Sequence, residues 1–298
     1  MFSNPRGGAL KAARGLRKIG EIDRQSIGDL EIEYWRAGAG SKTIVFIHGN
    51  SAGKEVFHHQ FATLSRQGYS LLAIDLPGHG GSSDSKSPER DYNFPAFALL
   101  VKRLLAALNI ETPLLVGWSL GGHVVIEMAG RGFDIAGAMI FGSPPVGPGL
   151  GEDFERAFLP SEAMAVTLKE NPSSDDLATY VNGLYGSLNP RPEAFVRLAE
   201  RMDGAVRSHM GAHWAAGDEG CHQKTVVAGW DKPICVIHGD EDVFASGDYI
   251  VNLKWRNLWR NEVIRMEGVG HAPFVETPDR FNSILSAFSA DVFAGPRT

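Results

Sequence analysis

A serine flanked by glycines is the feature of this sequence that points most directly to chemistry. Residues 117–122 read GWSLGG and place Ser119 between an apolar run at 113–116 and a stretch of helical periodicity. Strand, sharp turn and helix in this order present a nucleophilic serine above the edge of a sheet. The pattern predicts Ser119 as a nucleophile and the backbone N–H of Leu120, at the start of the helix, as a donor to an oxyanion. Glycine-rich turns of this kind also arise by chance, so the assignment depends on partners elsewhere in the chain.

A serine hydroxyl is a weak nucleophile until a base takes its proton, and His271 is the expected base. It lies in the segment GVGHAPF at 268–274, directly after the last apolar run. Loops that follow the carboxyl ends of strands hold the sites of open α/β sheets. The glycines on one side of His271 and the proline on the other indicate a loop built to hold one shape.

The histidine in turn needs a carboxylate that orients it. Residues 238–242, HGDED, follow the apolar run 233–237 and offer three acids. We favour Asp242, because it leaves room for a turn after the strand, and keep Asp240 and Glu241 as alternatives. The resulting order of serine, acid and histidine along the chain is one of the known orders of such triads.

A second donor to the oxyanion is expected from the loop HGNS at 48–51, which follows the apolar run 43–47. Asn50 is the expected contributor and Ser51 the alternative. We also assign contacts with the substrate to Ser51 and to Trp118. Trp118 adjoins the nucleophile, and core packing explains this residue equally well.

The elements that must position these residues follow from the apolar pattern. Runs rich in valine and isoleucine predict strands buried on both faces, at 43–47, 69–74, 113–116, 136–141, 233–237 and 263–266. Stretches of helical periodicity separate them, at 57–67, 94–108, 120–131 and 278–293. This alternation predicts a mostly parallel, doubly wound α/β sheet. Residues 30–36 alternate apolar and polar side chains and predict an antiparallel edge strand.

The strand pattern stops between residues 147 and 232 and resumes at 233. In this interval proline, glycine and asparagine are frequent, and helical pieces are expected near 153–168, 175–184 and 193–206. We therefore expect a helical cap at 147–232, inserted into an α/β core made of residues 29–146 and 233–298. Residues 1–28 contain several lysines and arginines without an apolar core, and predict a basic, loosely ordered leader.

Composition narrows the classes of partner. The net charge is −6, which argues against a nucleic-acid-binding surface. No apolar stretch reaches the length of a membrane span, and the two cysteines make no disulfide framework, so we expect a cytoplasmic protein without stable membrane insertion. No histidine spacing matches a metal site, so we expect neither a metal nor another cofactor. The sequence leaves the oligomeric state open.

Taken together, these segments resemble the α/β-hydrolase fold over residues 30–293. The matching pieces are HGNS at 48–51, DLPGHG at 75–80, GWSLGG at 117–122, GDED at 239–242 and GHAPF at 270–274. The resemblance implies an α/β sheet with an inserted helical cap and a Ser119–His271–Asp242 triad. A serine nucleophile argues against the haloalkane dehalogenases and epoxide hydrolases of this fold, which use an aspartate.

A narrower resemblance is to the α/β-hydrolase type of N-acyl-homoserine lactone hydrolases. It is carried by FIHGNS at 46–51, GWSLGGH at 117–123, GSPPV at 142–146 and NLW at 257–259. It implies a metal-free serine hydrolase that opens a lactone ring, with Tyr180 of the cap near the ligand. The alternatives are a general carboxylesterase, a carbon–carbon bond hydrolase, a perhydrolase, and a signal receptor that retains the triad.

Overall fold

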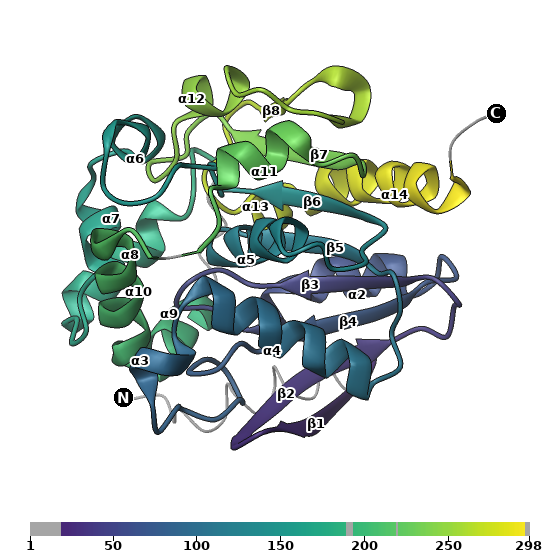
Figure 1. Cartoon of the computed structure of the whole chain (residues 1–298), viewed down its shortest axis with the longest axis horizontal. Coiled ribbons are helices and arrows are strands. Elements are labelled where there is room, and N and C mark those ends of the chain that lie inside the picture. Colours follow the sequence, from purple (N-terminus) through teal and green to yellow (C-terminus); the bar gives the residue numbers. More distant parts are fainter. Residues whose placement is uncertain (1–18, 189–192, 219, 296–298) are drawn as a thin grey trace.

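The computed structural model describes residues 19–188, 193–218 and 220–295. This part of the chain forms one eight-stranded sheet in the order β1-β2-β4-β3-β5-β6-β7-β8 (Figure 1). The strands are β1 (Glu21–Ile27), β2 (Leu30–Ala37), β3 (Thr43–Ile47), β4 (Ser70–Ile74), β5 (Leu114–Trp118), β6 (Gly137–Phe141), β7 (Ile234–Gly239) and β8 (Ile264–Met266). The pairs β1–β2 and β2–β4 are antiparallel, and every other neighbouring pair is parallel.

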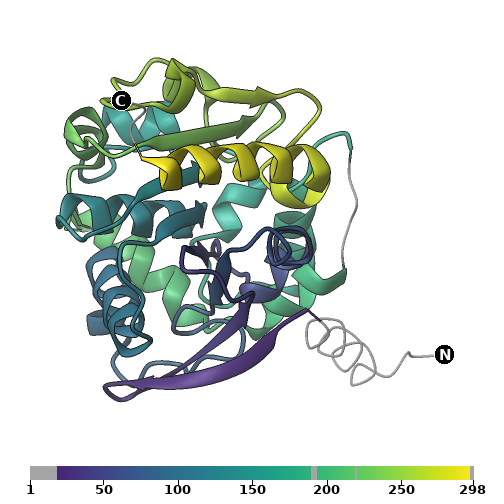
Figure 2. The ribbon, with the colours of Figure 1, turned by 90° about the vertical axis from the view of Figure 1, so that its right-hand side faces the viewer.

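Helices cover both faces of this sheet (Figures 1 and 2). On β3, Ile44 and Phe46 pack into one hydrophobic cluster, whereas Val45 and Ile47 pack into the other. Successive side chains of a strand point to opposite faces, so a strand between two helical layers must be apolar throughout. One layer contains α2 (His58–Leu64), α13 (Pro273–Glu276) and α14 (Pro278–Ala294), and the other α4 (Phe94–Ala107), α5 (Leu120–Gly130) and α11 (Gln223–Gly229).

The segment between β6 and β7 contains only helices among the described residues. They are α6 (Glu152–Ala157), α7 (Glu162–Val166), α8 (Ser174–Gly183), α9 (Glu193–Arg201), α10 (Gly204–Ala216) and α11. Helices α6–α10 gather at the carboxyl ends of the parallel strands, on the left of Figure 1. Helix α11 packs instead against α5 on the sheet. We call α6–α10 the cap helices. The short elements η1 (Lys54–Phe57), α3 (Pro88–Asp91), α12 (Gly247–Val251) and η2 (Trp259–Asn261) lie in connections.

The predicted α/β-hydrolase architecture is confirmed, with two corrections at the amino-terminal side of the sheet. Residues 30–36 form an antiparallel strand as expected, but β2 is not at the edge, because β1 pairs along its whole length. The expectation of a loosely ordered leader up to residue 28 is therefore wrong for Glu21–Ile27; residues 1–18 of that leader lie outside the described residues. Gly28, at φ 67°, provides the turn of this β1–β2 hairpin.

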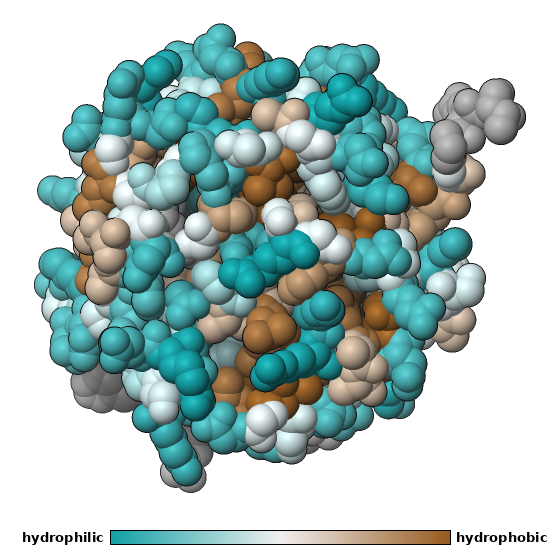
Figure 3. All heavy atoms as spheres, in the orientation of Figure 1, coloured by the Kyte–Doolittle hydropathy of each residue, from teal (hydrophilic) through white to brown (hydrophobic). Residues whose placement is uncertain are grey.

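The surface over α4 and α5 is mostly hydrophilic. Figure 3 shows apolar residues on this face in separate small groups rather than in one continuous area. Exposed apolar side chains that are scattered in this way are normal for a folded domain.

Candidate active site

Ser119 lies in a strained turn between β5 and α5. Its backbone has φ 52° and ψ −119°, in the region that residues with a side chain rarely adopt. Strain of this kind persists only where the surrounding structure enforces it, and it is common at functional sites. Here the preceding strand is buried on both faces and the following helix starts at once, so the turn has no length over which to relax.

Two glycines after Ser119 are required by lack of space. A Cβ atom on Gly121 would lie 2.1 Å from the carbonyl oxygen of Ile47, and one on Gly122 would lie 2.0 Å from Ser143 Oγ. Helix α5 therefore starts against the end of β3 and against the loop after β6. This close packing is the physical reason for the glycines that the sequence pattern contains.

His271 and Asp242 form a buried pair. His271 Nδ1 and Asp242 Oδ2 are 2.7 Å apart. The other carboxylate oxygen, Oδ1, accepts the backbone N–H groups of Phe244 at 2.8 Å and Ala245 at 3.1 Å. Burial alone would raise the pKa of Asp242, but the charge and hydrogen bond of His271 outweigh it and hold that pKa below its usual value. The carboxylate thus stays ionised beside the histidine ring.

The other two acids of the HGDED segment are occupied elsewhere. Asp240 accepts a hydrogen bond at 2.6 Å from Nε of Arg265, and Glu241 accepts one at 2.7 Å from the hydroxyl of Ser187. Of the three candidates, Asp242 is the one that the structure pairs with His271.

Ser119 and His271 line one cavity of about 190 Å³ beneath the cap helices, together with Asn50, Leu120 and Tyr180. Much of the remaining lining is aromatic or thioether: Phe94, Phe154, Phe158, Met164, Met210 and Trp214. Among the described residues that line it there is no lysine or arginine. A nucleophile and an acid-paired histidine facing an apolar cavity are the groups that acyl transfer to serine needs.

The loop that carries Asn50 is held by residues of the cap. The hydroxyl of Tyr180, on α8, donates to the backbone carbonyl of Asn50 at 2.7 Å. The side-chain amide of Asn50 reaches the carbonyl of Thr167 at 3.4 Å. On the core side, His48 bridges the loops that follow β3 and β4, because its Nε2 accepts the N–H of Leu76 at 3.0 Å. Asn50 is thus fixed between the sheet and the cap.

Two residues expected to contact the substrate do not line this cavity. Trp118 is fully buried, and its indole N–H donates to the backbone carbonyl of His271 at 2.8 Å. Ser51 is buried behind Asn50, with its N–H 3.1 Å from Met202 Sδ and its hydroxyl bonded to the Asn50 side chain. Trp118 instead supports the histidine loop and Ser51 supports the Asn50 loop.

Three residues near the site were not predicted from the sequence as site residues. Gly142 follows β6 at φ 63°, and a Cβ there would lie 2.5 Å from Cε1 of His271. Glu276 accepts the N–H groups of Gly270 at 2.9 Å and Gly186 at 2.8 Å, so it ties the histidine loop to the cap. Arg207 is buried behind Ser51. Their roles depend on contacts between segments that are distant in sequence.

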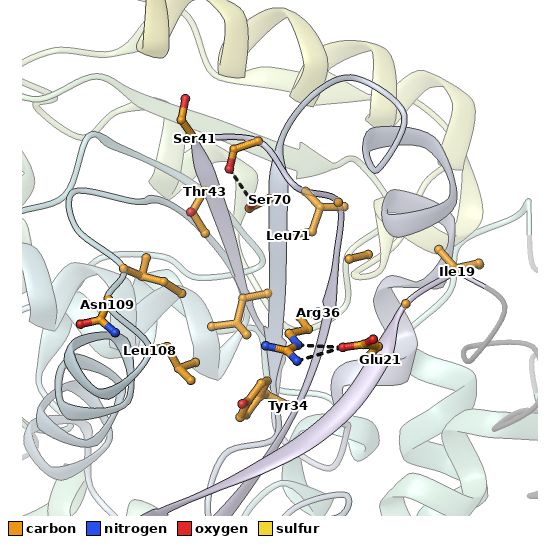
Figure 4. A pocket seen from close by; sticks show the side chains of 16 residues that line it. Ile19, Glu21, Tyr34, Arg36, Ser41, Thr43, Ser70, Leu71, Leu108 and Asn109 are labelled. Carbon is orange, nitrogen blue, oxygen red and sulfur yellow. Dashed lines mark hydrogen bonds and ion pairs between the residues drawn. The ribbon is translucent and has the colours of Figure 1, made fainter.

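A larger hollow, of about 650 Å³, lies at the other end of the sheet (Figure 4). It is lined by residues of β1, β2 and β4 and by the end of α4, and Arg36 there forms an ion pair with Glu21 at 2.9 Å. It contains none of the predicted site residues. The cavity beneath the cap is smaller, but it is the one that both Ser119 and His271 line.

Within the described ranges, the histidine, cysteine, aspartate and glutamate side chains form no group of three or more that could hold a metal ion. No helix in the same ranges is long and apolar enough to span a bilayer.

Comparison with known proteins identifies the family. The model of the alpha/beta hydrolase family matches residues 44–284. A crystal structure of a mutant of the N-acyl homoserine lactonase AidH, complexed with N-hexanoyl homoserine lactone, has a TM-score of 0.86 and 30% identity over 91% of this chain and 98% of that chain. Lipase 1 of Psychrobacter immobilis is 27% identical over 93% of this chain and 91% of its own length. A 2-hydroxy-6-oxononadienedioate/2-hydroxy-6-oxononatrienedioate hydrolase of Paraburkholderia phymatum is 27% identical over 87% and 91%. The chain therefore belongs to the alpha/beta hydrolase family.

Proposed function

We propose that this protein is a metal-free serine hydrolase that opens the ring of N-acyl homoserine lactones. The observation that carries the proposal is the meeting of Ser119 and the Asp242-paired His271 in one apolar cavity beneath the cap. The similarity to a lactonase structure that contains N-hexanoyl homoserine lactone supports the choice of substrate. In this proposal residues 147–232, apart from α11, form the cap, and the apolar lining holds the acyl chain.

The first step is attack by Ser119 on the lactone carbonyl. His271 Nδ1 is bonded to Asp242, so Nε2 is the nitrogen that takes the hydroxyl proton. The ring C–O bond of the tetrahedral intermediate then breaks, and His271 returns the proton to the leaving alkoxide. The alcohol stays attached to the acyl-enzyme, because it belongs to the same ring.

The negative charge of the tetrahedral intermediate is stabilised by the backbone N–H groups of Leu120 and Asn50. Leu120 is the first residue of α5, so its N–H has no acceptor within the helix. In the other loop, the contact of the Ser51 N–H with Met202 sulfur favours Asn50 over Ser51 as the donor. Loss of one such donor typically raises the barrier by about 3 kcal/mol.

The second step is hydrolysis of the acyl-enzyme. His271 takes a proton from water, the hydroxide attacks the ester carbonyl, and Ser119 leaves with the proton returned by His271. The product is the ring-opened N-acyl homoserine. Asp242 keeps the ring oriented and stabilises its protonated form in both steps.

The lining of the cavity favours an uncharged acyl substrate over a dicarboxylate. The related hydrolase from Paraburkholderia phymatum is named for dioate substrates. A dianion needs cationic or dense hydrogen-bonding partners when it is buried. The described lining offers aromatic and thioether side chains instead, without lysine or arginine.

The test is ring opening of N-acyl homoserine lactones of increasing chain length, followed by pH-stat titration. Wild type, Ser119→Ala and Ser283→Ala are compared, with p-nitrophenyl butyrate as a simple ester. Ser283 is an exposed serine of α14 whose hydroxyl bonds to the backbone of Asp279, and serves as the matched control. We expect Ser119→Ala to lose at least about a thousandfold in kcat and Ser283→Ala to keep the wild-type rate.

Each result has a definite meaning. Faster opening of lactones than cleavage of the simple ester, with an inactive Ser119→Ala, supports the lactonase proposal. Cleavage of the simple ester alone would keep Ser119 as a nucleophile and reject the lactone substrate. Tight binding of lactone with one slow turnover would point to a receptor.

A further inference from the structure

The turn formed by Asn50 and Ser51 requires support from outside itself. Ser51 has φ 58°, in the left-handed region that costs a residue with a side chain about 1–3 kcal/mol. The turn also holds the N–H of Asn50 in the place where the proposed mechanism needs an oxyanion donor. The Asn50 N–H lies one peptide unit before Ser51, so a relaxation of the Ser51 backbone would shift Asn50 and its N–H with it.

Arg207, on cap helix α10, supplies a continuous chain of hydrogen bonds to this turn. Its Nη2 donates to Ser51 Oγ at 2.8 Å, and the Ser51 hydroxyl donates to Asn50 Oδ1 at 2.8 Å. Nη2 also donates to the carbonyl of Ala199 at 3.2 Å, which anchors the guanidinium within the cap. The chain therefore runs from the cap, through Ser51, to Asn50.

The guanidinium is buried without an acid to neutralise it. Arg207 is 2% exposed, and its Nε has no hydrogen-bond partner among the described residues. Within the same residues no carboxylate lies at ion-pair distance from it. An uncompensated buried cation is unfavourable for folding, and burial lowers the pKa of Arg207. A neutral side chain could provide the same hydrogen bonds to Ser51 and Ala199. The presence of a charged guanidinium at this buried position therefore favours an electrostatic role for Arg207.

We propose that Arg207 is a positioning residue that completes the oxyanion hole from the cap. It holds the Asn50 N–H in place through Ser51 and adds positive potential behind the site where negative charge develops. Such fixed charge acts strongly in a site shielded from water. The inference rests on the proposed attack by Ser119, and it makes full activity dependent on the cap being seated on the core.

A neighbouring arginine provides a matched control. Arg201, at the end of α9, also ties the cap to the core, through Asp84 Oδ1 at 3.0 Å and the carbonyl of Ser82 at 3.0 Å. It is partly exposed, and within the described part of the chain its hydrogen bonds go to Asp84 and Ser82 rather than to the Asn50–Ser51 turn. Arg201→Met thus removes a cap–core contact, whereas Arg207→Met removes the chain to Asn50.

The experiment compares wild type, Arg207→Met, Arg207→Lys, Ser51→Ala and Arg201→Met. Four quantities are measured for each: kcat and KM with p-nitrophenyl butyrate, the thermal unfolding midpoint, and the affinity for butylboronic acid. The boron of this inhibitor binds the Ser119 oxygen, the hydroxyl proton passes to His271, and the tetrahedral boronate carries the negative charge. Its affinity therefore reports on the oxyanion hole without any turnover.

We expect Arg207→Met to lower kcat and boronate affinity by a similar factor, about tenfold to a hundredfold, with KM changed less than about threefold. Arg207→Lys retains the charge and should recover part of both losses. Ser51→Ala should lose part of both, because it breaks the chain and keeps the cation. Arg201→Met should keep the wild-type kcat and boronate affinity.

Equal boronate affinity in wild type and Arg207→Met would overturn the inference, even if the variant unfolds at a lower temperature, since that pattern describes a purely structural arginine. If Arg207→Met does not fold, unchanged kcat and affinity in Ser51→Ala have the same meaning. Failure of wild type to bind the boronate would also reject it. Failure to open lactones, by contrast, rejects the proposed substrate and leaves these comparisons on the simple ester and the boronate intact.

Discussion

At the scale of single residues, the site depends on how Asp242 is surrounded. Its two oxygens have separate tasks: one accepts two backbone N–H groups and the other pairs with His271. Because each oxygen is fixed, the carboxylate cannot rotate away from the imidazole ring. Its lowered pKa means that this pair stays intact to a pH below the usual range for aspartate.

Replacement of Asp242 by asparagine tests this arrangement with little change of shape. Asparagine can accept the backbone N–H groups, but it presents an amide where the histidine needs an anion, so the imidazole is held in the wrong tautomer. We expect kcat to fall by about a thousandfold or more, with a small change in stability. Asp240→Asn is the control, since Asp240 pairs with Arg265 at the surface. Equal losses in steady-state kinetics of the two variants would contradict the assignment.

The residues of the proposed triad could be identified from the sequence because each follows a recognisable strand. Ser119 comes directly after β5, whereas Asp242 and His271 lie in the loops that follow β7 and β8. The supporting residues could not be predicted in the same way. Trp118 adjoins the nucleophile in sequence, but successive residues of a strand point to opposite faces, and its side chain is directed into the core beneath His271.

At the scale of elements, the loop after β6 sets the position of the histidine ring. Gly142 adopts φ 63° where the chain leaves the strand, and the ring of His271 lies directly against its Cα. Two constraints favour glycine at this position: the left-handed backbone and the lack of room for a side chain. A pair of substitutions that separates these constraints measures how much activity depends on the space beside His271.

Gly142→Ala and Gly132→Ala form such a pair. Both residues have a positive φ, 63° and 68°, but a Cβ on Gly132 would meet nothing within 4 Å. Both variants should lose about 1–2 kcal/mol of stability from backbone strain, measured by urea unfolding. Only Gly142→Ala should lose kcat/KM, about a hundredfold, because its methyl group displaces His271. Wild-type kcat/KM in Gly142→Ala would show that the ring can shift without cost.

The elements themselves were predictable to different degrees for a physical reason. Strands buried on both faces must be apolar throughout, so β3, β4 and β6 stand out in the sequence. Strand β1 was missed, because it is exposed along most of its length and reads as a polar segment. It is held by pairing with β2 rather than by burial, and backbone pairing leaves no pattern in side chains.

At the scale of the whole molecule, buried ionisable groups are the part of the fold furthest from sequence-based expectation. Lys54 is fully buried, and its ammonium nitrogen lies 2.7 Å from a carboxylate oxygen of Asp75 and 2.6 Å from one of Glu33. Arg207 is buried as well. A charged residue is normally expected at the surface, and only the folded structure shows which charges have partners inside. The same holds for the buried histidines, because an exposed histidine has a pKa near neutral pH and burial lowers it.

Four buried histidines make the stability of this protein sensitive to mild acid: His48, His79, His123 and His238. Burial lowers the pKa of each, to about 4 for His123. Well above pH 6.5, the ordinary pKa of histidine, they are neutral in both the folded and unfolded states and add no pH dependence. As pH falls below that value, the unfolded state takes up protons that the folded state refuses, so the free energy of unfolding decreases.

His79 is the histidine with which to test this. Besides burial, the neighbouring His48, Arg207 and Arg201 oppose its protonation. Glu55 and Glu276 act in the opposite direction, since their raised pKa values favour the folded state in acid. The pH dependence of wild type alone therefore does not isolate His79, and the comparison must be between variants.

His79→Asn keeps a donor for the Pro77 carbonyl, which His79 Nδ1 contacts at 3.0 Å, and removes the titration of His79. From about pH 6.5 to pH 5, urea unfolding should show a slope of ΔG against pH that is shallower in His79→Asn than in wild type by up to about 1.4 kcal/mol per pH unit. Identical slopes would mean that His79 binds its proton equally well in the folded and unfolded chain, and that the acid sensitivity lies in other groups.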